Sequence, residues 1–216
     1  MFITKTVHIR LKLFLPVFKR RNIMYNEIVC AIRKNHYQPD TVKEAANLIL
    51  QKTDGQIPVK IVNICKQMGF SVYRQELPPK VCGYIVINGE LKDNFKTDRI
   101  ISVNENESNK RRRFTVAHEL AHYLFDFNPE QEIQYFNRFE LDHEKGKPEE
   151  DLANRFAAEL LMPEADMRSR YCKLNDGNCS YYDIVQSLSD EFLVPPKAID
   201  VRLKEELKLV ESRDGI

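Results

Sequence analysis

The sequence predicts an α+β protein that is mainly helical, with a small three-stranded, mainly antiparallel sheet beside a helix that carries the pattern H-E-x-x-H. Glycine accounts for only 7 of the 216 residues, which is typical of a largely helical chain. Apolar residues recur at helical spacing along most of the chain. Three short runs rich in β-branched and aromatic residues stand close together between residues 70 and 103, which indicates neighbouring strands.

Three helices are expected before the sheet, over residues 26–36, 40–52 and 58–68. Asp40 can cap the second of these helices. The third has a proline at its start and Gly69 in place to end it.

The strands are expected over residues 70–74, 83–88 and 99–103, separated by a Pro-Pro pair and an Asn-Gly turn. Strands so close in sequence favour antiparallel pairing. We expect residues 99–103 to form an edge strand, which can hold an extended peptide by strand addition.

The histidine-bearing helix follows a polar loop, in which either Ser108 or Asn109 can cap it, and is expected to end near Phe125. Residues 126–147 have no clear pattern. Beyond them, helices are expected over residues 148–161, from there to about Tyr171, and then, as a final pair, over residues 181–192 and 196–209.

The composition is that of a globular chain able to bury a core, with 43% hydrophobic and 30% charged residues. A net charge of +1 favours neither a nucleic-acid nor a membrane partner. The five cysteines are odd in number and form no C-x-x-C pair, which is typical of reduced thiols and not of a disulfide framework. We therefore expect a cytoplasmic protein.

Residues 1–23 differ from the rest, because they mix basic residues with the apolar run LFLPVF. Lys12 and the basic cluster of residues 19–21 keep this run too short for a transmembrane segment or a secretory signal. We expect a disordered or peripheral extension here, with a membrane-surface or partner-binding segment as the alternative. Residues 24–216 are then expected to form a single domain that ends in the helical pair.

The five residues His118 to His122, H-E-L-A-H, carry the main functional signal. Residues four apart share one face of a helix, so His118 and His122 can bind one ion at Zn–N distances of about 2.0–2.1 Å. Glu119 projects from the neighbouring face, where a carboxylate can act as general base on a metal-activated water. The alternative is two histidines on a polar helix edge, but the flanking residues are apolar and buried imidazoles need partners.

A catalytic zinc site needs a third protein ligand, and the expected helix over residues 148–161 supplies a candidate. Glu150 and Asn154 are four apart on one face, so that Glu150 can bind the metal while Asn154 hydrogen-bonds a ligating histidine. The alternative is that Glu150 and its acidic neighbours are solvated charges at a helix N-terminus. The basic run of residues 110–113 can steer an acidic substrate, pair with nearby carboxylates or form a solvated face.

In these motifs the chain resembles the ImmA/IrrE family of zinc metallopeptidases. The matching features are FTVAHELAH at residues 114–122 after a basic run, Glu150, ANRFAAELLMP at residues 153–163, and the closing segment over residues 192–203. The resemblance implies Zn²⁺ bound by His118, His122 and Glu150, with Glu119 as the base. It also implies cleavage of a protein substrate, often a helix-turn-helix repressor.

The leading hypothesis is thus a zinc-dependent endopeptidase acting on a regulatory protein. One alternative is a non-catalytic regulatory module that sequesters a transcription factor or an antitoxin-like partner. Another makes the final helical pair a helix-turn-helix that contacts DNA, but its charges are mixed and form no basic stripe, so direct nucleic-acid binding is not expected.

Overall fold

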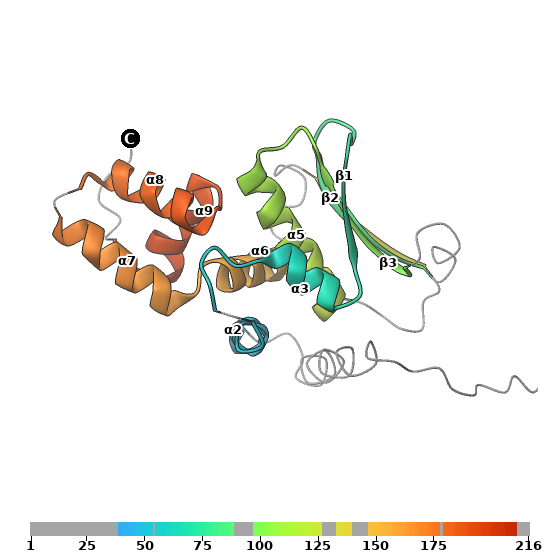
Figure 1. The fold of residues 1–216 in the computed structure, drawn as a ribbon, viewed down its shortest axis with the longest axis horizontal. Coiled ribbons are helices and arrows are strands. Elements are labelled where there is room, and N and C mark those ends of the chain that lie inside the picture. Colours follow the sequence, from blue (N-terminus) through green and yellow to red (C-terminus); the bar gives the residue numbers. More distant parts are fainter. Residues whose placement is uncertain are drawn as a thin grey trace, which may run out of the picture.

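The computed structural model describes residues 39–53, 55–88, 97–126, 133–139, 147–177 and 179–210. These residues form a mixed sheet, helices that pack beside it or on one another, and a C-terminal group of helices, so the mainly helical α+β class is confirmed (Figure 1). The expected extension at residues 1–23 and the helix expected over residues 26–36 lie outside the described residues.

The first two described helices are α2 (Pro39–Leu50) and α3 (Ile61–Gln67). Helix α2 begins at Pro39, one residue before Asp40. Helix α3 begins three residues later than predicted, because the backbone of Lys60 is not helical (φ −81°, ψ 65°). Gly69 follows the helix end with φ +89°, a left-handed conformation that favours glycine and ends the helix as expected.

The sheet contains four described strands in the order β1-β3-β2-β4, with bounds Ser71–Gln75 (β1), Val81–Asn88 (β2), Arg99–Asn104 (β3) and Ile133–Phe139 (β4). Strand β1 pairs parallel with β3, while β2 pairs antiparallel with both β3 and β4. The three predicted strands are present, and β4 adds a fourth from the segment that showed no clear pattern.

Strand β3 was expected at the edge of the sheet, and the structure contradicts this. Its two sides pair with β1 and β2, and its residues Ile101 and Val103 are buried in the core. Among the described strands, β1 and β4 are the edges.

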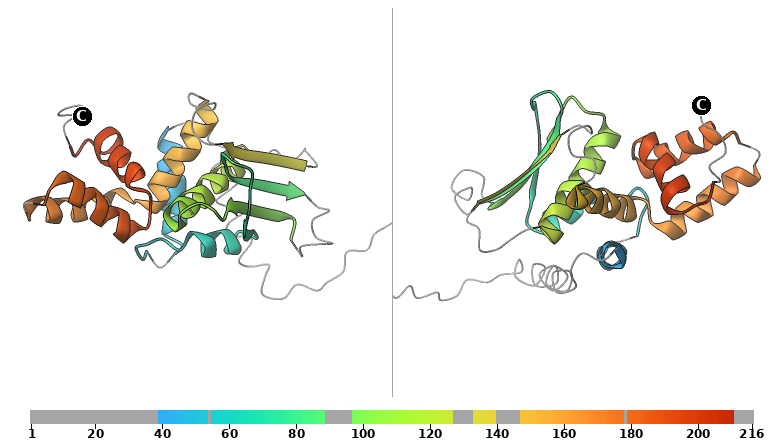
Figure 2. Two further views of the ribbon diagram at one scale, coloured as in Figure 1. Left: turned by 90° about the horizontal axis from the view of Figure 1, so that it is seen from above. Right: turned by 180° about the vertical axis from the view of Figure 1, so that it is seen from behind.

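Helix α5 (Asn109–Phe125) lies on one face of the sheet, and α6 (Pro148–Leu161) packs against α5 (Figures 1 and 2). Ser108 caps α5, since its hydroxyl accepts a hydrogen bond from the Arg111 N–H at 3.2 Å. Helix α6 has the predicted bounds, with Pro148 in its first turn. Helix α2 covers α6 from outside, so α6 is packed between two helices.

The C-terminal group consists of α7 (Glu164–Asp176), α8 (Tyr181–Phe192), α9 (Pro196–Val201) and a π-helical turn, η1 (Arg202–Glu206). Helix α8 has the predicted bounds, whereas α7 runs five residues past Tyr171. The last predicted helix, over residues 196–209, is divided into α9 and η1 and ends at Glu206.

The basic run at the start of α5 is used for contacts within the protein. The Lys110 ammonium donates to Ser189 Oγ at 2.8 Å and pairs with Asp190 Oδ1 at 2.6 Å, both in α8. Arg113 donates to the carbonyl of Leu193 at 3.1 Å and to that of Val59 at 2.7 Å. These contacts join the first turns of α5 to α8, to the turn after α8 and to the segment before α3.

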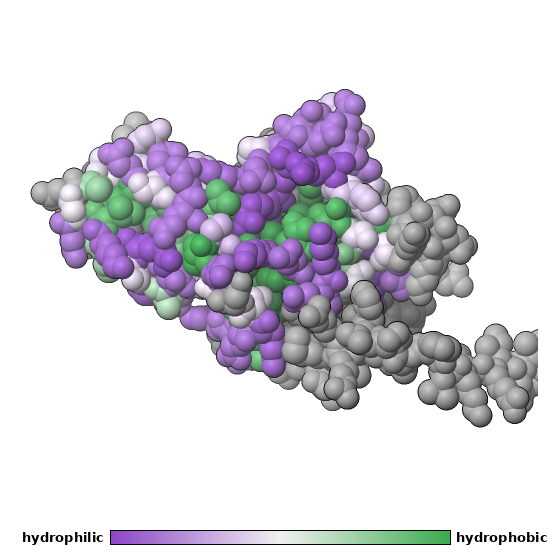
Figure 3. Space-filling model, viewed as in Figure 1, coloured by the Kyte–Doolittle hydropathy of each residue, from purple (hydrophilic) through white to green (hydrophobic). Residues whose placement is uncertain are grey.

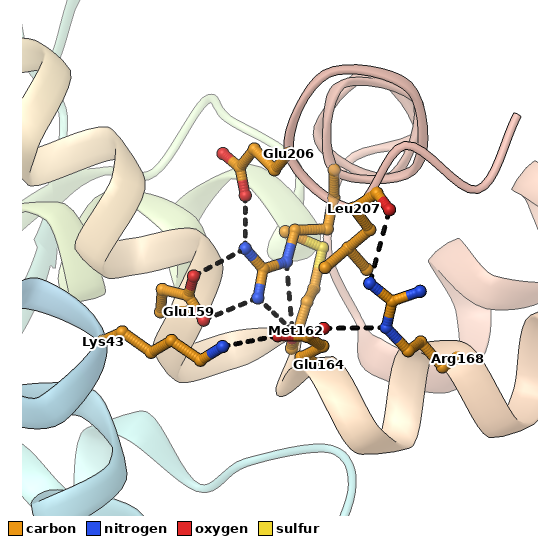
Figure 4. Close-up of polar contacts among 8 residues, drawn as sticks. Lys43, Glu159, Met162, Glu164, Arg168, Glu206 and Leu207 are labelled. Atoms are coloured by element: carbon orange, nitrogen blue, oxygen red, sulfur yellow. Dashed lines mark hydrogen bonds and ion pairs between the residues drawn. The ribbon is translucent and has the colours of Figure 1, made fainter. Parts of the chain in front are cut away.

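A buried arginine joins the C-terminal group to the far end of α6. Arg202 is 1% exposed, and its guanidinium donates two hydrogen bonds to the Glu159 carboxylate, at 2.9 and 2.6 Å (Figure 4). It also donates to the Met162 carbonyl at 3.3 Å and pairs with Glu206. A bidentate pair of this kind is both strong and directional, so it fixes η1 against α6.

A second set of contacts lies beside the first. Glu164, at the start of α7, accepts hydrogen bonds from Lys43 of α2 at 2.6 Å and from Arg168 at 2.7 Å (Figure 4). The bonds to Lys43 and Arg168 lower the pKa of Glu164 to about 2. The carboxylate is therefore charged at neutral pH and links α2 to α7.

The surface seen in Figure 3 is mostly hydrophilic, with hydrophobic residues in separate patches. Within the described parts of the chain, no helix combines the length and apolar character needed to cross a membrane.

We predict that Arg202→Met destabilises the protein by about 3–5 kcal/mol, because it leaves the buried Glu159 carboxylate without its main partner. Urea unfolding followed by circular dichroism measures the change. The double variant Arg202→Met/Glu159→Leu is expected to recover most of the loss, since it removes both charges. Lys197→Met is the control, because the Lys197 side chain is 80% exposed and its pair with Asp200 is worth about 0–1 kcal/mol. A single-variant cost no larger than that of the control would contradict the prediction.

Candidate metal centre

Helix α5 carries the H-E-x-x-H residues in its most buried part. His118 and Glu119 are fully buried, and His122 is 4% exposed. The apolar residues around them pack α5 between the sheet and α6, so the polar side chains are enclosed with the core. The first turn of α6 reaches this part of α5 and brings Glu150 to the two imidazoles.

Three side-chain groups converge at this point. The Nε2 atoms of His118 and His122 are 3.1 Å apart. Glu150 places Oε2 at 3.0 Å from His118 Nε2 and Oε1 at 3.4 Å from His122 Nε2. Two ligands bound to a tetrahedral ion at about 2.0–2.1 Å lie about 3.3 Å from each other. The three separations therefore suit the corners of one metal site.

The outer nitrogen of each imidazole has its own acceptor. His118 Nδ1 lies 3.0 Å from Asn154 Oδ1, and His122 Nδ1 lies 2.7 Å from Asp126 Oδ2. Both partners are oxygen acceptors, so each neutral ring carries its proton on Nδ1 and directs the lone pair of Nε2 towards Glu150. When both rings are neutral, two lone pairs and a carboxylate face one another and repel, and a proton or a metal ion shared between them relieves this repulsion.

The electrostatics of the three groups favour positive charge between them. Burial acts to lower the pKa of His122, but hydrogen bonds to Asp126 and Glu150 and the nearby Glu119 charge outweigh it and raise the pKa to about 10. Burial likewise acts to raise the pKa of Glu150, and hydrogen bonds to His118 and His122 outweigh it and hold the pKa well below its usual range. His118, His122 and Glu150 thus form a group able to hold a metal ion.

Each predicted site residue has a definite place. His118, His122 and Glu150 meet, and Asn154 lies behind His118 as expected. Glu119 is buried on the neighbouring face of α5, close enough to His122 to act on its pKa. Glu149, the alternative acid beside Glu150, is exposed.

Asp126 was not anticipated from the sequence. It follows His122 by four residues, at the C-terminal cap of α5, so the same helical spacing that relates the two histidines also points to it. A carboxylate that accepts from the outer nitrogen of a metal-binding histidine orients the ring and makes it a better ligand.

A model of the Peptidase_M78 family, described as the IrrE N-terminal-like domain, matches residues 74–204. No curated protein matches the chain. Among solved structures, the chain is similar to a Mycobacterium tuberculosis transcriptional regulator, with 18% identity and a TM-score of 0.51. The match covers 91% of this chain and 53% of that one, so the chain spans about half the length of the regulator. At this identity the likeness shows the fold alone.

Replacing Glu150 with alanine is expected to remove one corner of the site and to release the metal. We predict that Glu150→Ala weakens Zn²⁺ binding by more than about 10–100-fold, which is the usual effect of changing a residue that only hydrogen-bonds a metal ligand. Metal analysis after dialysis, with circular dichroism as a check on folding, measures the effect. Glu149→Ala, at the exposed neighbour, is the matched control and should retain metal. Full metal retention by Glu150→Ala would exclude Glu150 as a ligand.

Asp126→Asn should leave the three proposed ligands in place and weaken metal binding by about 10–100-fold, because the His122 ring loses its charged acceptor. Competition with a coloured chelator gives the metal affinity of each variant. Asp151→Asn, an exposed change of the same kind on α6, should bind metal like the unmodified protein. Equal affinities for the two variants would show that Asp126 does not support the site.

Proposed function

Because the chain belongs to the Peptidase_M78 family of IrrE N-terminal-like domains, whose model matches residues 74–204, we propose that it is a zinc-dependent endopeptidase that cleaves a regulatory protein. The observation that carries the proposal is the meeting of His118, His122 and Glu150, with the buried Glu119 beside them. A purely structural pair of buried histidines would not need a carboxylate from another helix directed between their inner nitrogens.

The donor set fits the metal that the family implies. Two imidazole nitrogens and one carboxylate oxygen are the protein ligands of many hydrolytic zinc sites, which keep a fourth position open. We assign the Zn²⁺ ligands as His118, His122 and Glu150, with Asn154 and Asp126 fixing the two rings. Zn²⁺ held there supplies a Lewis acid for the scissile carbonyl and lowers the pKa of water towards about 7.

Glu119 is the proposed general base. Its carboxylate takes a proton from the attacking water and then delivers that proton to the departing amine. Because Glu119 is buried, bulk water is kept away from this proton transfer. The exclusion of water strengthens the electrostatic interactions of the Glu119 carboxylate in the site.

The peptide is proposed to bind along β4 as an added strand. Strand β4 is an edge of the described sheet and contacts α5, whereas β3, the edge expected from the sequence, is enclosed by its neighbours. Backbone hydrogen bonds to such an edge hold a substrate in extended form with little dependence on its side chains. This suits a proteolytic target with an unfolded or flexible cleavage segment.

We infer that the target is a protein that regulates transcription, such as a helix-turn-helix repressor. The inference is supported by the family resemblance, and the solved structure of similar fold is named as a transcriptional regulator. The C-terminal helices carry mixed charges. They contact the rest of the chain through the pairs Lys110–Asp190 and Arg202–Glu159, so we propose no direct role for them in DNA binding.

The test is Glu119→Gln, which keeps the size of the side chain and removes the base. We predict a loss of about 10²–10⁴-fold in peptidase activity with metal content unchanged. New protein N-termini can be compared in cells that express the unmodified chain or the variant, and cleavage products should appear only with the former. If control of the target survives in the variant, the protein acts by sequestration and not by cleavage.

A further inference from the structure

Gly83 of β2 lies at an unusually close contact between the sheet and helix α5. A Cβ at this position would be 2.6 Å from Thr115 Cγ2 in α5 and 2.8 Å from the carbonyl oxygen of Ser102 in β3. Carbon atoms in contact are normally about 3.5–4.0 Å apart. Glycine is therefore required here for the strand and the helix to approach so closely.

The same position borders the carboxylate of Glu119. A Cβ at residue 83 would lie 3.6 Å from Glu119 Oε1, so the bare backbone of Gly83 forms one wall beside that oxygen. Thr115 lies one helical turn before Glu119 and is fully buried on the same side of α5. Strand β2 also has an irregular register opposite β4 between Val81 and Gly83, which places a local bend at this wall.

We propose that Gly83, together with Thr115, is a positioning residue that fixes the carboxylate of Glu119 within the site. This inference rests on the proposed function, in which Glu119 is the base. An added methyl group at residue 83 displaces the strand or Thr115 by about 1 Å, and this moves the wall against which the Glu119 carboxylate lies. A displacement of about 1 Å at a catalytic group can cost roughly 100-fold in rate.

The metal ligands do not share this wall. His118 and His122 are held by the contact between α5 and α6, in which Ala121 of α5 and Ala153 and Ala157 of α6 are fully buried. Their outer nitrogens are fixed by Asn154 and Asp126. A change at Gly83 should therefore act on Glu119 and leave metal affinity intact, which a general loss of stability would not do.

The experiment uses the full chain loaded with Zn²⁺ and compares G83A with E119Q. Acetohydroxamic acid serves as the probe, because it binds zinc and donates a hydrogen bond to a carboxylate placed beside the metal. We expect G83A to bind this probe about 10-fold more weakly or worse, approaching E119Q, since a charge-assisted hydrogen bond is lost. Zinc affinity should stay within about twofold of the unmodified chain, as expected for ligands held by the helices alone. Calorimetry gives the probe affinity and chelator competition gives the zinc affinity.

G177A is the matched control, because its φ of −79° suits alanine and its added Cβ meets nothing closer than 3.4 Å. The double variant G83A/T115S removes the methyl group that the new Cβ would strike and should recover part of the probe affinity. If G83A does not fold, the double variant, which lacks the methyl group that the new Cβ would strike, takes its place in the comparison with G177A, and weaker probe binding than in G177A is still expected.

The outcomes separate this inference from the proposed function. Probe binding by G83A equal to that of G177A overturns the role of Gly83. A parallel fall in zinc affinity, probe affinity and urea midpoint also overturns it, because the glycine is then needed only for folding. If the unmodified chain binds no zinc, or if E119Q does not weaken the probe, the proposed function fails before Gly83 is tested.

Discussion

The site depends on one physical constraint, which is the close approach of α5 and α6. Three electron-rich groups from two helices can meet only if the helix backbones are near each other, and small residues make this possible. Ala121, Ala153 and Ala157 are fully buried, and each follows a site residue by three positions, on the same side of its helix. Repulsion among the converging groups opposes this packing until positive charge is present, so helix packing and cation binding stabilise the same arrangement.

The C-terminal helices stabilise that arrangement from the ends remote from the metal centre. Lys110 and Arg113 join the first turns of α5 to α8 and to the turn after it. Arg202 of η1 binds the last turn of α6 through its ion pair with Glu159. Both site helices are therefore fixed by one C-terminal unit. This gives the closing helices a structural role in the fold.

Local sequence patterns predicted the bounds of individual helices, whereas strand β4 and the geometry of the site depend on contacts between residues far apart in the sequence. The bounds of α6 and α8 were predicted because a proline with acidic residues starts α6 and because α8 is strongly amphipathic. Strand β4 was missed, since it is held by pairing with β2, about 50 residues earlier. The sequence offered Glu150 among three adjacent acids, and only the rotation of α6 against α5 directs it to the histidines. The close passage of β2 over Thr115 likewise depends on tertiary packing.

The donor set of two imidazoles and one carboxylate has a consequence for metal supply. Such ligands bind copper more strongly than zinc and also accept iron, cobalt and nickel, so ligand chemistry alone does not choose zinc. The ion that occupies the protein then depends on which metals the cell keeps scarce and which it keeps exchangeable. Metal loading would follow cellular metal homeostasis, and a change in copper or zinc availability would alter the fraction of the protein that carries zinc without any change in its synthesis.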